Sequence, residues 1–163
     1  MKGTPCMFTG RIDVRQLRPR EVNARVVNDI NDLLKKQHSK ARRLNEDSLA
    51  AYSKNNKVVV AWNDNEHIIG MGVLIVVDAA SHEYGVVHHL TVLRGADSLT
   101  LRAKIMESLI TRVVEVEFFM INILPTDRNA VIFLTSMGFT QRKLSYRLSS
   151  ACALRYLKLS QEQ

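Results

Sequence analysis

A β-hairpin in the middle of the chain is the feature that most constrains its fold. Residues 58–62 and 68–77 are rich in valine and isoleucine, and they flank the polar cluster Asn63-Asp64-Asn65-Glu66. Two β-rich runs on either side of such a cluster predict two strands joined by a tight turn. A loop over 78–83 and a third strand over 84–92 are predicted to extend the hairpin into a meander.

A strand–helix–strand order follows the meander. Residues 98–114 place apolar side chains on one helical face, and the apolar run 118–124, which Pro125 ends, is typical of a buried strand. Asp127 is a candidate cap for a helix that runs to Met137 and ends at Gly138, and residues 144–148 alternate as a closing strand. The helix over 98–114 therefore predicts a crossover connection in an α/β chain.

The N-terminal part is predicted to supply a strand and two helices. Residues 12–17 alternate apolar with polar side chains. Arg18-Pro19-Arg20-Glu21 then opens a helix whose apolar face comprises Val22, Val26, Val27, Ile30, Leu33 and Leu34. Asn45 is a plausible N-cap for a short helix that ends in polar residues 53–56. We expect this pair of helices to pack beside the meander.

The length predicts one domain. With 163 residues, 46% of them hydrophobic, the chain has enough apolar surface for one core. We expect a single domain over 1–163, with a flexible N-terminus over 1–11 and a C-terminal extension over 151–163 that could be an extra helix. Cys6 and Cys152 are far apart in sequence, which predicts neither a disulfide framework nor a metal site. No apolar run has the length of a signal peptide or membrane span, so we expect a soluble, cytoplasmic protein.

The net charge of +7 raises the question of an anionic partner. The densest basic run covers residues 35–43 and contains no aromatic side chains on which nucleic-acid bases would stack. A solvated helix end explains the run equally well, because Lys and Arg near a helix C-terminus complement its dipole. Nucleic-acid binding is therefore disfavoured, and a steep loss of affinity with salt would be its signature.

The order of the later segments resembles the GNAT family of acyl-CoA-dependent N-acetyltransferases. The strand over 85–92, the turn after it, Asp127-Arg128-Asn129-Ala130 and Met137-Gly138-Phe139 follow one another as in that family. The resemblance implies a GNAT-like α+β fold with a mixed, mostly antiparallel sheet flanked by helices and a V-shaped splay between the fourth and fifth strands. It also implies acetyl-CoA as co-substrate, no metal, a small-molecule or protein amine as acceptor, and homodimerisation as an open alternative.

The turn after Val92 is degenerate as a pyrophosphate-binding loop. The glycine-rich motif of the family maps to residues 97–102, which contain no glycine. Glycines serve there because backbone N–H groups must approach phosphates closely at a helix N-terminus. The hydroxyl groups of Ser98 and Thr100 and the guanidinium of Arg102 are possible replacements, whereas Asp97 would repel a phosphate. The alternative is that Ser98 simply caps the helix. The residues that the resemblance assigns to the coenzyme are Leu90, Thr91, Val92, Asp97, Ser98, Leu99, Thr100, Leu101, Arg102, Asp127 and Asn129.

His88 and His89 are candidate bases for the acceptor amine. They are adjacent on a predicted strand and so point to opposite faces. An imidazole of ordinary pKa accepts a proton at neutral pH, although a structural, hydrogen-bonded histidine is the competing interpretation. The tyrosine that protonates the departing thiolate in the family maps to Leu134, which has no proton to donate. Tyr146 is a replacement from the neighbouring strand or else a packing residue.

Two functions follow from these residues. The first is an N-acetyltransferase that moves an acetyl group from acetyl-CoA to a primary amine by direct attack. The second is a pseudoenzyme that keeps the fold as a binding or assembly module, which the missing glycines, Asp97 and Leu134 favour. Tight coenzyme binding separates them.

Overall fold

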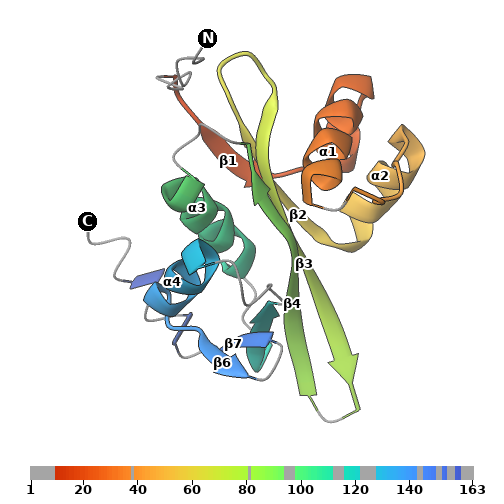
Figure 1. Cartoon of the computed structure of the whole chain (residues 1–163). Helices are drawn as coiled ribbons and strands as arrows, with labels where there is room; N and C mark the ends of the chain where they lie inside the picture. The colour runs from red at the N-terminus through yellow and green to blue at the C-terminus, as the bar shows by residue number, and fades with distance from the viewer. Residues whose placement is uncertain are drawn as a thin grey trace. The chain divides into compact units, whose positions relative to one another are not determined.

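The computed structural model describes residues 10–37, 39–80, 82–93, 98–111, 116–121, 128–142, 145–149, 152–153 and 157–158. The chain forms two compact units (Figure 1). The first unit comprises Met1–Val73 with His89–Ser108, and the second comprises Leu74–His88 with Leu109–Gln163. Single-domain organisation stays a prediction.

Seven strands form one hydrogen-bonded sheet with the order β1-β2-β3-β4-β5-β7-β6. Their bounds are β1 Asp13–Gln16, β2 Lys57–Trp62, β3 Ile68–Ala79, β4 His82–Val92, β5 Phe118–Ile121, β6 Thr140–Arg142 and β7 Ser145–Ser149. β4 and β5 pair in parallel, whereas the pairs β1–β2, β5–β7 and β6–β7 are antiparallel. The predicted mixed sheet is confirmed, and the parallel pair is the one joined by the crossover helix.

Four α-helices and one 3₁₀ turn are described: η1 Pro19–Glu21, α1 Ala24–Gln37, α2 Glu46–Asn55, α3 Ser98–Ile110 and α4 Arg128–Ser136. α2 begins as predicted, because the Asn45 side chain accepts a hydrogen bond from the Ser48 backbone N–H at 2.8 Å. None of the described helices combines the length and the apolar character that crossing a membrane requires.

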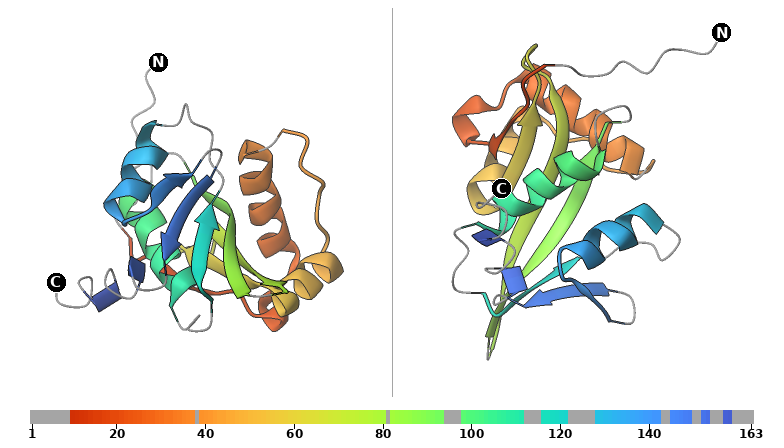
Figure 2. Two further views of the ribbon diagram at one scale, coloured as in Figure 1. Left: turned by 90° about the horizontal axis from the view of Figure 1, so that it is seen from below. Right: turned by 90° about the vertical axis from the view of Figure 1, so that its left-hand side faces the viewer.

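β2 and the first part of β3 are covered on both faces. Figures 1 and 2 show α1 and α2 on one side of β2 and β3, and α3 on the other. Val58 to Ala61 are therefore all buried, and so are Ile68 to Val73. Such uninterrupted burial distinguishes these strands from a sheet with one wet face. α1 contributes its apolar stripe of Val26, Val27, Ile30, Leu33 and Leu34, and α3 contributes Leu101, Ile105 and Met106.

Gly70 lies where three elements of the first unit meet. A Cβ atom built there would be 2.9 Å from Val92 Cγ1 at the end of β4 and 3.0 Å from Ile105 Cδ1 in α3. The absence of a side chain therefore lets both the strand and the helix pack closely on β3.

The second unit has its own apolar core. Phe119, Leu134 and Leu148 are almost completely buried, together with Phe118, Ile121, Phe133, Met137 and Phe139. The Tyr84 ring stacks on Phe118 of the paired strand, with 5.3 Å between centroids. Gly85 leaves room for the Phe119 ring, since its Cβ would lie 2.8 Å from Phe119 Cδ1.

The helix predicted from Arg18 to Leu34 is wrong at its start. The chain forms η1, becomes extended at Val22, and begins α1 at Ala24. The reason is a local cap: Asn23 Oδ1 accepts a hydrogen bond from the Val26 N–H at 3.1 Å. Val22 therefore belongs to the link between η1 and α1 rather than to the apolar face of α1.

Three further expectations are corrected. The loop predicted over 78–83 is shorter, because β3 runs to Ala79 and β4 starts at His82. β6 was missed, since the polar residues Thr140–Arg142 show no apolar alternation and become a strand only by pairing with β7. Ser98 is the first residue of α3 rather than its cap. The predicted ends at 111–114 and 122–124 and the cap at Asp127 fall wholly or largely outside the described residues.

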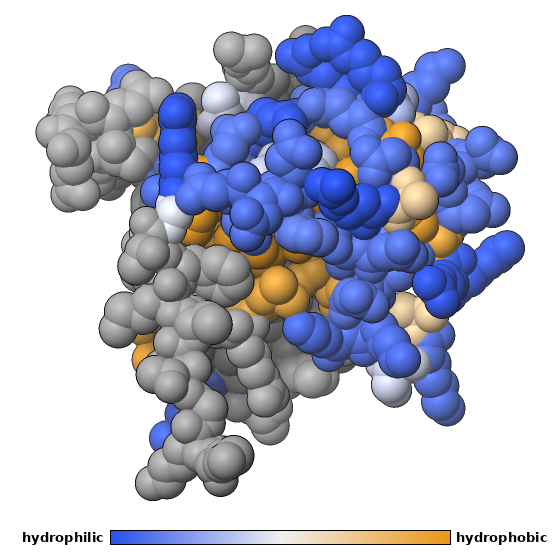
Figure 3. All heavy atoms as spheres, turned by 90° about the horizontal axis from the view of Figure 1, so that it is seen from above, coloured by the Kyte–Doolittle hydropathy of each residue, from blue (hydrophilic) through white to orange (hydrophobic). Residues whose placement is uncertain are grey.

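The basic run at the end of α1 is exposed. Lys35, Lys36, Lys40, Arg42 and Arg43 all face solvent. Figure 3, a view from above, shows hydrophilic residues over much of the described surface, with apolar residues visible between them. The link from α1 to α2 is fixed by Asn31, whose side chain exchanges two hydrogen bonds with the Leu44 backbone at 2.8 and 2.9 Å.

Gly70→Val is expected to destabilise the protein by about 1–3 kcal/mol, because both new methyl groups compete with Val92 and Ile105 for filled space. Urea denaturation followed by far-UV circular dichroism measures the change. Val76→Thr, at a half-exposed position of β3, is the control and should change stability by under about 0.5 kcal/mol. Equal stability of Gly70→Val and the wild type would show that the contact is not tight.

Candidate coenzyme site

β4 changes its backbone conformation at His89. Its register with β5 runs from Tyr84–Phe118 to Val87–Ile121, and along this stretch Gly85 and Val87 are buried while Val86 is half-buried. His89 then has φ +54°, in the left-handed region that residues other than glycine seldom occupy. Such a residue interrupts the regular pleat of the strand. The V-shaped splay expected beyond this point involves residues 122–127, which lie outside the described residues.

The left-handed backbone at His89 bears on the prediction for the two histidines. Regular alternation would place His88 and His89 on opposite faces, but that rule requires extended backbone at both residues, and His89 is not extended. Every side chain from His88 to Val92 is half-buried. The opposite orientation of the two imidazoles therefore stays a prediction, and both are partly accessible.

The end of β4 is held against the start of β3. The Leu93 N–H donates to the Ile69 carbonyl at 2.8 Å, and Val92 packs at Gly70. Leu90, Thr91 and Val92 are consequently fixed in position while still reaching the surface in part. These are the residues whose backbone the sequence assigned to the coenzyme.

The first turn of α3 mixes core and surface residues. Leu99 and Thr100 are exposed, Leu101 is buried, and Arg102 is half-buried. The Leu101 side chain is thus part of the apolar core. Asp97 lies outside the described residues, as does the Ser98 side chain.

The Arg102 side chain has an unmet hydrogen-bonding requirement. Its Nε is buried, and no acceptor for it occurs in the part of the chain that the structure describes. A buried donor without an acceptor costs about 1–3 kcal/mol. An anionic oxygen is the partner best suited to a guanidinium, and α3 begins only four residues earlier, at Ser98.

Several solved structures with a similar arrangement of elements bear the name acetyltransferase. One chain of the NatC complex bound to Gag peptide and CoA superposes with a TM-score of 0.69 at 16% identity, covering 85% of this chain and 98% of that one. An acetyltransferase of the GNAT family from Staphylococcus aureus gives 0.65 at 15% identity, covering 86% and 99%. The protein yncA from Salmonella typhimurium, with its cofactor acetyl-CoA, gives 0.63 at 14% identity, covering 86% and 94%.

The chain has the GNAT fold. No protein-family model and no curated protein matches the sequence. TM-scores of 0.63–0.69 establish the fold. Because the sequence identities are only 11–16%, the activity has to be argued from the residues. The resemblance that the sequence showed is confirmed at the level of the fold.

The remaining residues of the GNAT pattern lie in the second unit. Leu134, at the position of the family's tyrosine, is only 1% exposed and packs in the core. Tyr146 is in β7, paired with Ile121 and Gln141, but its side chain lies outside the described residues. Asn129 is in the first turn of α4, and its side chain is also outside them. Their roles stay predictions.

No group of three or more metal-ligating side chains occurs within the described ranges. The described side chains of the candidate site supply imidazole, hydroxyl and guanidinium groups.

The left-handed backbone at His89 predicts a residue-specific effect on stability. His89→Val should cost at least about 1–2 kcal/mol, because a β-branched side chain disfavours this conformation, whereas His89→Asn should cost less. His88→Val is the control, since valine suits extended backbone. Chemical denaturation measures all three variants. Equal losses of stability for His88→Val and His89→Val would contradict a left-handed backbone conformation at His89.

Proposed function

We propose that the protein transfers an acetyl group from acetyl-CoA to a primary amine by direct attack within a ternary complex. The buried Nε of Arg102, which has no acceptor among the described residues, carries the proposal, because it lies in the first turns of α3, where the GNAT fold would receive a pyrophosphate. Thr100, exposed in the same turn, adds a hydroxyl. Together they replace part of what glycine N–H groups would provide.

Both substrates of the proposed reaction, the coenzyme and the acceptor, have precedents in the solved structures. The yncA structure is described with its cofactor acetyl-CoA, and the NatC complex with CoA and a peptide. By analogy, acetyl-CoA is the proposed co-substrate here, and the acceptor is a small-molecule or protein amine. Homodimerisation through residues 151–157, most of which lie outside the described residues, remains part of the proposal.

The reaction needs a neutral amine. A base first removes a proton from the acceptor ammonium, and the nitrogen then attacks the thioester carbonyl to form a C–N bond. The C–S bond breaks to release thiolate, and the nitrogen loses a second proton, which ends on the sulfur of CoA. His88 or His89 takes the first proton in this proposal, since both are partly accessible. The backbone of Leu90 to Val92 polarises the carbonyl, a type of interaction that contributes about 3 kcal/mol. Alignment of amine and thioester supplies much of the remaining catalysis.

Departure of the thiolate is the less well supported step. Leu134 has no proton to donate and is buried. Tyr146 is the proposed proton donor, and departure as thiolate without an acid is the alternative, because thiolates are stable anions near neutral pH.

Coenzyme binding tests the proposal directly. Titration calorimetry with acetyl-CoA, and with CoA for comparison, should give micromolar affinity at moderate salt. Arg102→Glu should weaken it at least roughly tenfold, because a charge-assisted hydrogen bond is replaced by repulsion. Lys104→Glu, an equal charge change at an exposed position of the same helix, is the control and should weaken it much less. No binding at millimolar acetyl-CoA would contradict the acetyltransferase function.

The histidines are tested by activity once an acceptor has been found in an amine screen. Replacement of the base, in His88→Gln or His89→Asn, should lower kcat by about 10²–10⁴ and leave acetyl-CoA affinity unchanged. Added imidazole should restore part of the rate in the affected variant only. If both variants keep full kcat, neither histidine is the base.

A binding or assembly module is the second candidate function. Burial of Leu134 where the family has its tyrosine favours it, because no acid is available at that position. A protein that binds CoA weakly, fails every amine acceptor and is recovered with a stable partner would fit this candidate instead.

A further inference from the structure

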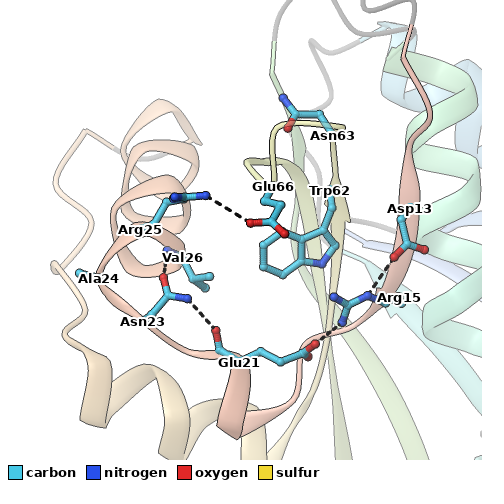
Figure 4. A pocket seen from close by; sticks show the side chains of 10 residues that line it. All are labelled: Asp13, Arg15, Glu21, Asn23, Ala24, Arg25, Val26, Trp62, Asn63 and Glu66. Atoms are coloured by element: carbon cyan, nitrogen blue, oxygen red, sulfur yellow. Dashed lines mark hydrogen bonds and ion pairs between the residues drawn. The ribbon is translucent and has the colours of Figure 1, made fainter.

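A pocket of about 700 Å³ lies in the first unit and is separate from the coenzyme residues. Its walls come from β1, η1, the N-terminal end of α1, the end of β2 and the turn before β3, and none of its lining residues belongs to β4 or α3. Figure 4 shows Trp62 in the middle, with α1 on one side and β1 on the other. The acetyl-transfer proposal gives this pocket no role.

One wall is rigid and charged. The β1–β2 register places Asp13 opposite Trp62, and Arg15 lies with its guanidinium carbon 5.2 Å from the centre of the indole ring. Arg15 also donates to Asp13 at 2.9 Å and to Glu21 at 2.6 Å. Burial lowers the pKa of Arg15, but these two carboxylates outweigh it and raise the pKa overall. Arg15 is thus a cation held by hydrogen bonds to two carboxylates of the pocket.

The opposite wall offers an ion pair that opens easily. Arg25, in the first turn of α1, lies 3.6 Å from Glu66, and their side chains are 54% and 84% exposed. A pair this long and this exposed contributes little to stability, so a ligand can separate it at small cost. Glu66 is held in the turn by a hydrogen bond from its N–H to the Asn63 carbonyl at 3.0 Å. One cation and one anion are therefore available at the pocket.

The indole N–H of Trp62 lacks an acceptor. Its Nε1 is buried and has no hydrogen-bond partner among the residues that the structure describes. Arg15, its neighbour, has only donors and cannot satisfy it. A buried indole N–H usually finds a partner, and an oxygen atom brought by a ligand would provide one.

We propose that this pocket binds a small zwitterion of the amino-acid or short-peptide class. The ligand carboxylate accepts hydrogen bonds from Arg25, its ammonium group pairs with Glu66, and a further oxygen atom of the ligand is the acceptor for Trp62 Nε1. Its apolar part lies against the indole ring and Val26, which is buried at the pocket floor. The ligand thereby exchanges the weak Arg25–Glu66 pair for two complementary ones, and the pocket volume is in the range of small-molecule sites.

Trp62 is the only tryptophan in the chain, so its fluorescence reports on this pocket alone. The probe is the dipeptide leucyl-glycine with free termini, titrated into the full chain without any coenzyme. We expect a saturable change in Trp62 emission. Acetylation of its N-terminus or amidation of its C-terminus should each weaken binding about two- to fivefold, since each removes one charged contact with a largely exposed side chain. No saturable change at millimolar dipeptide, or equal binding of the blocked forms, would overturn the proposal.

Two exposed variants test the assigned contacts. Arg25→Gln should weaken binding of the free dipeptide but change binding of the amidated form little. Glu66→Gln should likewise weaken binding of the free dipeptide but change binding of the acetylated form little. Both residues are largely solvent-exposed, so folding should be preserved and can be checked by circular dichroism. Arg42→Gln, at an exposed position outside the pocket, is the matched control. Failure of coenzyme binding leaves this test intact, because no step in it uses acetyl-CoA.

Discussion

Close packing at Gly70 is the contact on which the candidate coenzyme site depends. Val92 and Ile105 both approach this glycine on β3, and the Leu93 N–H is bound to Ile69 just beside it. These contacts fix the end of β4 and α3 on the same stretch of β3. Core packing therefore positions Arg102 and the nearby backbone, which form the proposed anion-binding site.

The left-handed residue at His89 is a second constraint with consequences for chemistry. A non-glycine residue in this conformation costs about 1 kcal/mol and persists only where its surroundings hold it. Here it follows the β4–β5 register directly and leaves His88 to Val92 partly accessible. Strain at this point of the strand thus coincides with the residues proposed to hold the thioester and to deprotonate the amine.

The two candidate sites of the first unit use charge differently. At α3 the Nε of Arg102 is buried and finds no acceptor in the part of the chain that the structure describes, which suits an anionic ligand. In the Trp62 pocket, cations and carboxylates alternate around an aromatic ring, which suits a ligand that carries both signs. The net charge of +7 predicts neither of these two charge arrangements, because it sums over the whole chain while recognition depends on individual neighbouring groups.

The sequence by itself determined the elements that depend on local signals. The polar cluster between the β2 and β3 segments, the Asn45 cap and the apolar face of α3 depend on residues close together in the chain, and the order of segments was enough to indicate the GNAT fold. Tertiary structure decided what depends on distant partners: β6 forms only by pairing with β7, and His89 takes its conformation inside an otherwise regular strand. The sequence did not predict a contact between Arg15 and Trp62, because only strand pairing brings residues so far apart in the chain into one pocket.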